Sequence, residues 1–223
     1  MNNSTFKTTK KIFPLLVLAL LAITACNKKN NNQLSGTAYI QVTNASQADS
    51  PMDFYIGSTK ENTLPLPYTQ STNYFSVNAG QKQPAAFKTS ATGNMLVGFQ
   101  ITPLPGVYYS IFYFGGNTVS YIDDLSIAAG KARVRFINLN KDLTDNLDFG
   151  VTGAGAPLVT GLSPAFDSQY YSVAPGSSFS IYISGSTTSM LDIPTTTEAG
   201  HVYTIYLSGT LKADLKATVL LQK

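Results

Sequence analysis

The pattern of hydrophobic and polar positions changes near residue 26. Residues 12–23 form an uncharged apolar run, and Lys7, Lys10 and Lys11 precede it. A helix over this run rises about 18 Å, which is well short of the roughly 30 Å hydrocarbon core of a membrane. A charged start followed by a short apolar run is typical of a secretory signal peptide.

After residue 35 the pattern predicts strands. Short runs rich in Val, Ile, Tyr, Phe and Thr are separated by Gly, Pro and Asn, and no stretch keeps apolar residues at helical spacing. The chain is therefore predicted to be all-β, with immunoglobulin-like β-sandwiches. The strands predicted in the C-terminal part are Ala132–Asn138, Leu147–Val151, Gln169–Val173, Phe179–Ser184, Met190–Ile193, Val202–Leu207 and Leu215–Leu221.

An internal repeat predicts the number of domains. Four blocks recur in the same order at offsets of 94 to 96 residues. They pair Gly36–Asn44 with Gly130–Asn138, Met52–Phe54 with Leu147–Phe149, Tyr74–Gly80 with Tyr170–Gly176, and Gly106–Ile111 with Gly200–Ile205. A period of this length suits a sandwich domain better than a solenoid. We expect two tandem domains, residues 36–129 and 130–223.

Ile23-Thr24-Ala25-Cys26 resembles the bacterial lipobox, in which a cysteine follows an aliphatic and two small residues. The resemblance implies that diacylglycerol is attached to the thiol of Cys26, that signal peptide 1–25 is removed, and that the new amine is acylated, as with palmitate. Residues 26–35 would then be the lipidated cysteine and a flexible polar tether. The alternative is an ordinary signal peptide. Cys26 is the only cysteine, which excludes an intrachain disulfide.

The residues after Cys26 indicate where the protein is sorted. Asn27 in place of aspartate resembles lipoproteins that are sent to the outer membrane. Some lipoproteins reach the cell surface through acidic residues at this place, and Lys28 and Lys29 depart from that pattern. We expect a lipid-anchored protein of the cell envelope at the outer membrane. The periplasmic face is favoured, and the surface face stays open.

The charge excludes one class of partner. The net charge of +3 includes the three lysines of the signal peptide, so the mature chain is about neutral. Arg133 and Arg135 are the only arginines and do not form a basic patch. Nucleic acid is therefore not an expected partner.

The repeated blocks resemble the extracytoplasmic bacterial domains known as domain of unknown function 4397. The resemblance rests on the strand Ala132–Asn138, the step Leu147–Phe149, the turn Tyr170–Gly176 and the closing strand Ala199–Ile205, and it is closest in the second copy. It implies a β-sandwich envelope lipoprotein, often in tandem, and it brings no catalytic residues with it.

Candidate catalytic residues are few. His201 is the only histidine, and Val107 takes its place in the first copy, which favours a packing role. Asp53 and Asp148 are aligned between the copies and are expected to accept backbone hydrogen bonds at strand starts. Glu61 and Glu198 fall at unrelated places, so no pair of carboxylates repeats. No catalytic site and no cofactor are predicted, and a glycoside hydrolase ranks below a binding module.

The loop 140–148 is a weak calcium candidate, because Asp142, Asp145 and Asp148 supply oxygen ligands. The loop lacks the glycine and terminal glutamate of the helical calcium loop. The competing interpretation is a solvated turn.

Aromatic residues are abundant, with 13 tyrosines and no tryptophan. They could line a sugar-binding surface or fill the cores of small sandwiches. The strand 108–114 is apolar on both faces, which favours a core or interdomain position. The leading hypothesis is a membrane-anchored, non-catalytic binding or structural module. Polysaccharide and an envelope protein are the alternative partners.

Overall fold

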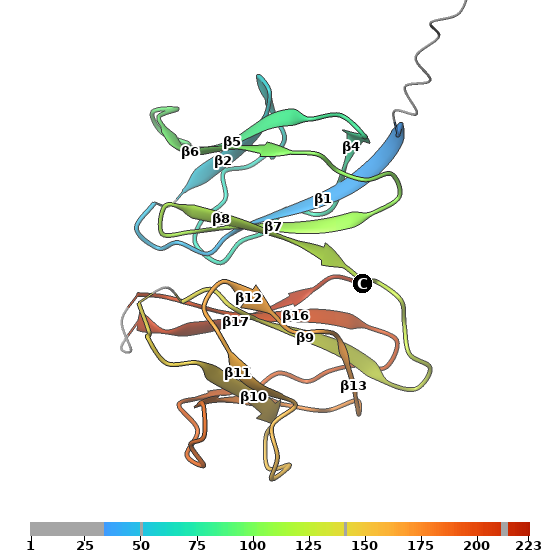
Figure 1. Ribbon diagram of the computed structural model, residues 1–223, viewed down its shortest axis with the longest axis vertical. Coiled ribbons are helices and arrows are strands. Elements are labelled where there is room, and N and C mark those ends of the chain that lie inside the picture. Colours follow the sequence, from blue (N-terminus) through green and yellow to red (C-terminus); the bar gives the residue numbers. More distant parts are fainter. Residues whose placement is uncertain (1–33, 50, 141, 211–213) are drawn as a thin grey trace, which may run out of the picture. The chain divides into compact units, whose positions relative to one another are not determined.

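The computed structural model describes residues 34–223 except 50, 141 and 211–213. Residues 34–223 form one compact unit. Its described residues are built from β-strands and contain no α-helix, so the predicted all-β class is confirmed (Figure 1). The same residues include no helix of the length and apolarity that a membrane crossing requires. The predicted signal peptide, Cys26 and the tether up to residue 33 lie outside the described residues.

Two sheets form the first half of this unit, which we define as strands β1 to β8. One sheet has the order β4-β1-β7-β8, with β4 (Phe75–Ala79), β1 (Gly36–Asn44), β7 (Tyr108–Phe114) and β8 (Asn117–Asp123). The other has the order β3-β2-β5-β6, with β3 (Thr59–Lys60), β2 (Met52–Ile56), β5 (Gln83–Thr89) and β6 (Met95–Ile101). β1 and β7 are parallel, and the other pairs are antiparallel.

The second half, strands β9 to β17, has a corresponding pair of sheets. One has the order β12-β9-β16-β17, with β12 (Phe166–Asp167), β9 (Ala132–Asn138), β16 (Val202–Ser208) and β17 (Lys216–Leu221), and β13 (Tyr171–Val173) also pairs with β9. The other has the order β11-β10-β14-β15, with β11 (Val159–Leu162), β10 (Leu147–Val151), β14 (Phe179–Ile183) and β15 (Leu191–Ile193). β9 and β16 are parallel, as β1 and β7 are.

Apolar side chains on one face of each strand give each half its own core. Ile40 and Val42 of β1 face Phe54 and Phe87 of the opposite sheet. In the second half, Val134 and Phe136 of β9 belong to one cluster with Phe149, Phe179 and Ile205. Because side chains on a strand point to alternate faces, the intervening residues of β1, β7, β9 and β16 point away from these cores.

A third cluster joins the two halves. It is apolar, and its members are Ala45, Phe112, Phe114, Tyr121, Ile137, Leu139 and Tyr206. The rings of Phe112 on β7 and Tyr206 on β16 lie 5.3 Å apart, centroid to centroid. β7 is therefore covered on both faces, by its own sandwich and by the second half, as its two apolar faces predicted.

Two aligned asparagines make the same hydrogen bonds in the two halves. The side-chain amide of Asn44 donates to the Leu66 carbonyl, and its oxygen accepts from the Ser46 N–H. Asn138 donates to the Leu162 carbonyl, and its oxygen accepts from the Asn140 N–H. In both halves one buried asparagine therefore ties the end of the first strand to the loop that follows and to a distant segment.

The predicted strands of the second half agree closely with the observed ones. β9 and β10 have the predicted bounds, and the other predicted strands differ from β13 to β17 by one or two residues at their ends. β11 and β12 were not predicted, because β11 is four residues long and contains Gly161, and β12 has two residues. The limits of the two domains stay a prediction, since residues 34–223 form a single compact unit.

Candidate functional site

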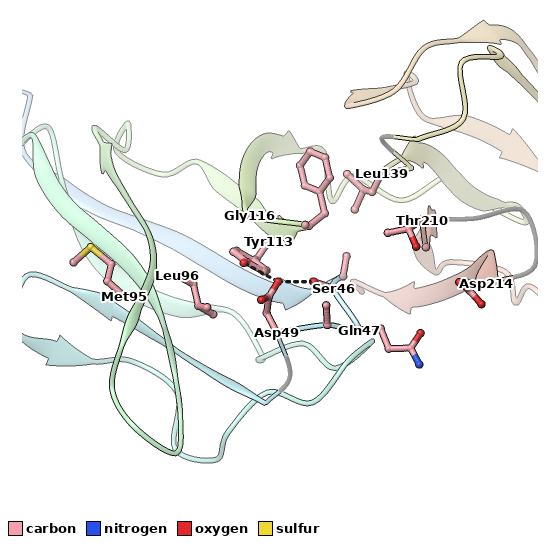
Figure 2. Close-up of a pocket in the computed structure, with 15 residues that line it drawn as sticks. Ser46, Gln47, Asp49, Met95, Leu96, Tyr113, Gly116, Leu139, Thr210 and Asp214 are labelled. Carbon is pink, nitrogen blue, oxygen red and sulfur yellow. Dashed lines mark hydrogen bonds between the residues drawn. The ribbon is translucent and has the colours of Figure 1, made fainter.

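A pocket of about 690 Å³ lies between the two halves, where several loops meet (Figure 2). The first half contributes the loop after β1, the start of β6 and the turn after β7, and the second half contributes residues next to β9 and in the loop after β16. The lining residues are Ala45, Ser46, Gln47, Ala48, Asp49, Met95, Leu96, Tyr113, Phe114, Gly115, Gly116, Leu139, Gly209, Thr210 and Asp214. This size is typical of small-molecule sites.

The polar centre of the pocket is the carboxylate of Asp49. The hydroxyls of Ser46 and Tyr113 both donate to its Oδ2, each at 2.9 Å. Burial, together with the Asp49 carboxylate, raises the pKa of Tyr113 to about 12. Tyr113 therefore stays protonated at neutral pH and holds Asp49 in place (Figure 2).

The rest of the lining is mostly apolar. Ala45, Phe114 and Leu139 belong to the cluster that joins the two halves. Met95 is 65% exposed and lies at the pocket with Leu96. An apolar wall with a few convergent polar groups suits reversible binding of a small ligand. The ionisable residues among the described lining are Asp49, Asp214 and Tyr113.

A buried ion pair joins the two halves, at residues that do not line this pocket. Arg135 of β9 is fully buried, and its guanidinium pairs with Asp123 of β8, in the other half. The same guanidinium donates to the Thr204 hydroxyl and to the Ile122 carbonyl. Asp167 lies 3.5 Å from it, and burial, only partly offset by Arg135, raises the pKa of Asp167.

Hydrogen bonds extend this contact between the halves. Tyr74 and Ser110 donate to Oδ2 of Asp123, at 2.7 and 2.8 Å. The amide of Gln222 donates to both of these hydroxyls, and its oxygen accepts from Thr204 at 2.8 Å. Burial, together with the Asp123 charge, raises the pKa of Tyr74 well above its usual value. The halves therefore meet through a polar network as well as an apolar cluster.

The sequence patterns do not predict the residues of this contact. Arg135 bears there only on the question of an external basic patch, and no pattern marks Asp123. The usable signal is the position of Arg135 between Val134 and Phe136, two core residues on β9. An arginine on the reverse face of such a strand is a reason to expect that this face is covered by another part of the chain.

The aligned aspartates have different partners in the structure. Asp148 accepts from the backbone N–H groups of Gly161 and Gly185, as predicted. Asp53 lies 2.9 Å from Nζ of Lys60 and accepts from the side chain of Asn62. The prediction of backbone bracing is thus confirmed for Asp148, whereas the partners shown for Asp53 are side chains.

The structure does not gather the calcium candidates. Among the described residues, no group of three or more His, Cys, Asp or Glu side chains could hold a metal ion, and Asp142, Asp145 and Asp148 are no exception. Asp142 and Asp145 are exposed, whereas both carboxylate oxygens of Asp148 accept backbone hydrogen bonds. The three carboxylates are thus not brought together, and calcium binding at this loop stays a prediction.

The remaining candidates lie apart from the pocket. His201 is half-buried in the turn before β16, 3.9 Å from Glu198, and its ring lies 6.2 Å from that of Tyr203, centroid to centroid. Burial raises the pKa of Glu61, which lies next to β3. Each of the 13 tyrosines is buried or half-buried.

A family model described as "Domain of unknown function (DUF4397)" matches residues 38–148. The match supports this domain family over a segment that runs from β1 into β10. The repeated blocks resemble the family more closely in the second copy, whereas most of the matched residues lie in the first half. No curated protein matches the chain.

Among solved structures, the chain is similar to CBMbc (family CBM26) from Eubacterium rectale Amy13K, in complex with maltoheptaose. The sequence identity is 14%, the similarity covers 82% of this chain and 96% of that chain, and the TM-score is 0.26. At this identity and TM-score the similarity carries no argument about the ligand or the function of this chain.

Proposed function

We propose that this chain is a bacterial envelope lipoprotein, anchored at the outer membrane through a lipid on Cys26, whose two tandem β-sandwich domains act as a non-catalytic binding module. The lipobox resemblance and the polar tether support the anchor. Asn44 and Asn138 make equivalent hydrogen bonds in the two halves, which supports the tandem arrangement. The periplasmic face is the favoured side of the membrane.

The pocket between the two halves is the observation that carries the binding function (Figure 2). Its ligand has an apolar part that contacts Leu96, Phe114 and Leu139. It also has a donor group that reaches Asp49, because a carboxylate only accepts hydrogen bonds. A neutral or cationic small molecule fits this lining, and so does a side chain of a protein partner.

A thermal-shift screen of residues 34–223 tests this function. The panel contains polysaccharides, peptidoglycan fragments, calcium and a chelator. A ligand at a hundred times its dissociation constant stabilises the folded state by about 2.7 kcal/mol. Ala48 is exposed at the pocket, so Ala48→Trp fills the pocket without changing a core. Ala129→Trp, at an exposed position outside the pocket, is the matched control.

The proposal expects a ligand that stabilises the wild type and Ala129→Trp but not Ala48→Trp. A ligand that stabilises all three proteins equally binds elsewhere on the molecule, and the assignment to this pocket is contradicted if every stabilising ligand behaves in this way. No stabilisation by any compound contradicts a small-molecule ligand and favours a structural or protein-partner role.

A carbohydrate-binding surface is the alternative within the binding class, and a glycoside hydrolase ranks below it. Reproducible hydrolysis of a glycan that is lost in Asp148→Asn or Glu198→Gln would overturn the non-catalytic proposal.

A further inference from the structure

A second pocket, of about 520 Å³, lies on the outer side of the sheet β11-β10-β14-β15. Its walls are the loop 152–157, after β10, and the loop 184–187, after β14. Both loops extend beyond β10 at the end of the second half that lies at the bottom of Figure 1. None of its lining residues belongs to the pocket between the halves.

Tyr182 stands out among the tyrosines of residues 34–223. It is the one that belongs to no core cluster and whose side chain has no hydrogen bond, ring contact or cation–π partner in the described residues. It is half-buried on β14, directly opposite Asp148 on β10. Paired residues on neighbouring strands point to the same face, so ring and carboxylate lie side by side at the pocket.

Asp148 brings a negative charge to the pocket. It is only 6% exposed. Burial opposes its ionisation, but the N–H groups of Gly161 and Gly185 outweigh this effect and keep the pKa of Asp148 below its usual value. No lysine or arginine of the described residues pairs with it, whereas its counterpart Asp53 lies beside Lys60. An anionic ligand is therefore disfavoured, and a ligand rich in hydroxyl donors is favoured.

The walls of this pocket are largely backbone. Gly153, Gly155 and Gly185 have positive φ angles of 77°, 75° and 81°, and a Cβ on any of them would meet no atom within 4 Å. A Cβ on Gly150 would lie 3.1 Å from Cα of Pro157, so the loop packs directly on β10. The pocket therefore presents peptide groups to a ligand from a loop that is fixed in place.

From this arrangement we propose that the pocket binds a neutral pyranose sugar, with one face of the sugar ring on Tyr182 and hydroxyl groups that donate to Asp148. An aromatic ring offers the apolar contact that the C–H face of a pyranose needs. The carboxylate and the glycine backbone offer the hydrogen bonds that its hydroxyls need. This site is separate from the pocket proposed above and does not depend on it.

The test is calorimetric titration of residues 34–223 with maltotriose, cellotriose, chitotriose and mannotriose. Tyr182→Ala should weaken binding about tenfold or more, which corresponds to a loss of about 1.4 kcal/mol. Tyr182→Phe keeps the ring and should stay within about threefold of the wild type. The matched control is Tyr55→Ala, since Tyr55 is a half-buried tyrosine on β2, away from this pocket.

Asp148→Asn should also weaken binding about tenfold, because a hydrogen bond to a charged acceptor becomes a neutral one. Circular dichroism then has to show that each variant keeps its fold, and Tyr182→Ala serves as the decisive variant if Asp148→Asn unfolds. Binding of none of the four sugars at 10 mM overturns the proposal, and so does binding that Tyr182→Ala leaves unchanged. Ala48→Trp should bind the sugar normally, so failure of this site is distinct from failure of the pocket between the halves.

Discussion

At the scale of single residues, Arg135 has the most unusual environment. It is the largest fully buried side chain of the described residues, and it reaches from β9 to Asp123 in the other half. A buried charge is tolerated only when a partner and hydrogen bonds replace the lost water. Asp123, Thr204 and the Ile122 carbonyl supply them. One residue thus links the two sandwiches.

Arg135→Met should lower the free energy of unfolding by about 3–5 kcal/mol, because it leaves Asp123 buried without its cation. Urea unfolding followed by circular dichroism measures the change. In the double variant Arg135→Met with Asp123→Asn, part of the loss should return, since the unpaired charge is gone. An equal or larger loss in the double variant would contradict the explanation.

Arg133 supplies the control for that prediction. It pairs with Asp124 at 2.8 Å, and the side chain of Asp124 is 56% exposed. The side chain of Arg133 is 14% exposed, but Arg133→Met should still cost less than Arg135→Met, because the carboxylate that loses its partner remains in contact with water. A loss as large as that of Arg135→Met would show that burial is not the cause of the difference.

Asp148 predicts a dependence on pH. Its folded pKa is lowered, so its contribution to stability is present above the unfolded pKa, near about 4, and is lost as the pH falls through the folded pKa. Asp148→Asn should therefore be less stable than the wild type at pH 7, and the difference should shrink below about pH 4. Urea unfolding between pH 2 and 7 tests this, and a difference that is constant with pH contradicts it.

At the scale of the elements, two aligned glycines allow a matched comparison. Gly80 and Gly176 have φ angles of 79° and 80° after corresponding strands. A Cβ on Gly176 would meet nothing within 4 Å, whereas a Cβ on Gly80 would lie 1.5 Å from the Leu34 carbonyl oxygen. The two glycines have the same backbone conformation, but only Gly80 has another backbone segment packed against it.

Gly176→Ala should cost about 1–2 kcal/mol, which is the cost of a left-handed conformation for a residue with a Cβ. Gly80→Ala should cost more in residues 34–223, because the new methyl group overlaps the backbone of Leu34. When the chain begins at Gly36, the two substitutions should cost about the same. Thermal unfolding measures all four differences, and an equal cost in the longer chain would contradict the contact with Leu34.

Individual strands are the part of the fold that the sequence pattern predicts best. Alternation and turn residues were sufficient for β9, β10 and β16, because each has a buried face and clear ends. The double-sided apolar character of β7 correctly indicated cover from two sides. Strand order, the pocket around Asp49 and the partners of Arg135 depend on contacts between distant segments, which no local pattern contains.

At the scale of the whole molecule, the two halves have separate cores and a shared contact. The core of the second half consists entirely of its own residues. We therefore expect residues 130–223 to fold alone with a sheet-rich circular dichroism spectrum, at lower stability than residues 34–223, because Arg135 and Ile137 lose their partners. An unfolded fragment would contradict its autonomy as a domain.

The anchor is the part of the proposal on which its place in the cell depends. The measurement that tests it most directly is labelling of cells with radioactive palmitate, followed by separation of membranes, for the wild type and Cys26→Ser. The account predicts a labelled, processed protein in the membrane fraction for the wild type. For Cys26→Ser it predicts an unlabelled precursor that is not cut before residue 26 and carries no lipid. A Cys26→Ser protein that is still labelled, processed and bound to membranes would contradict the lipoprotein assignment.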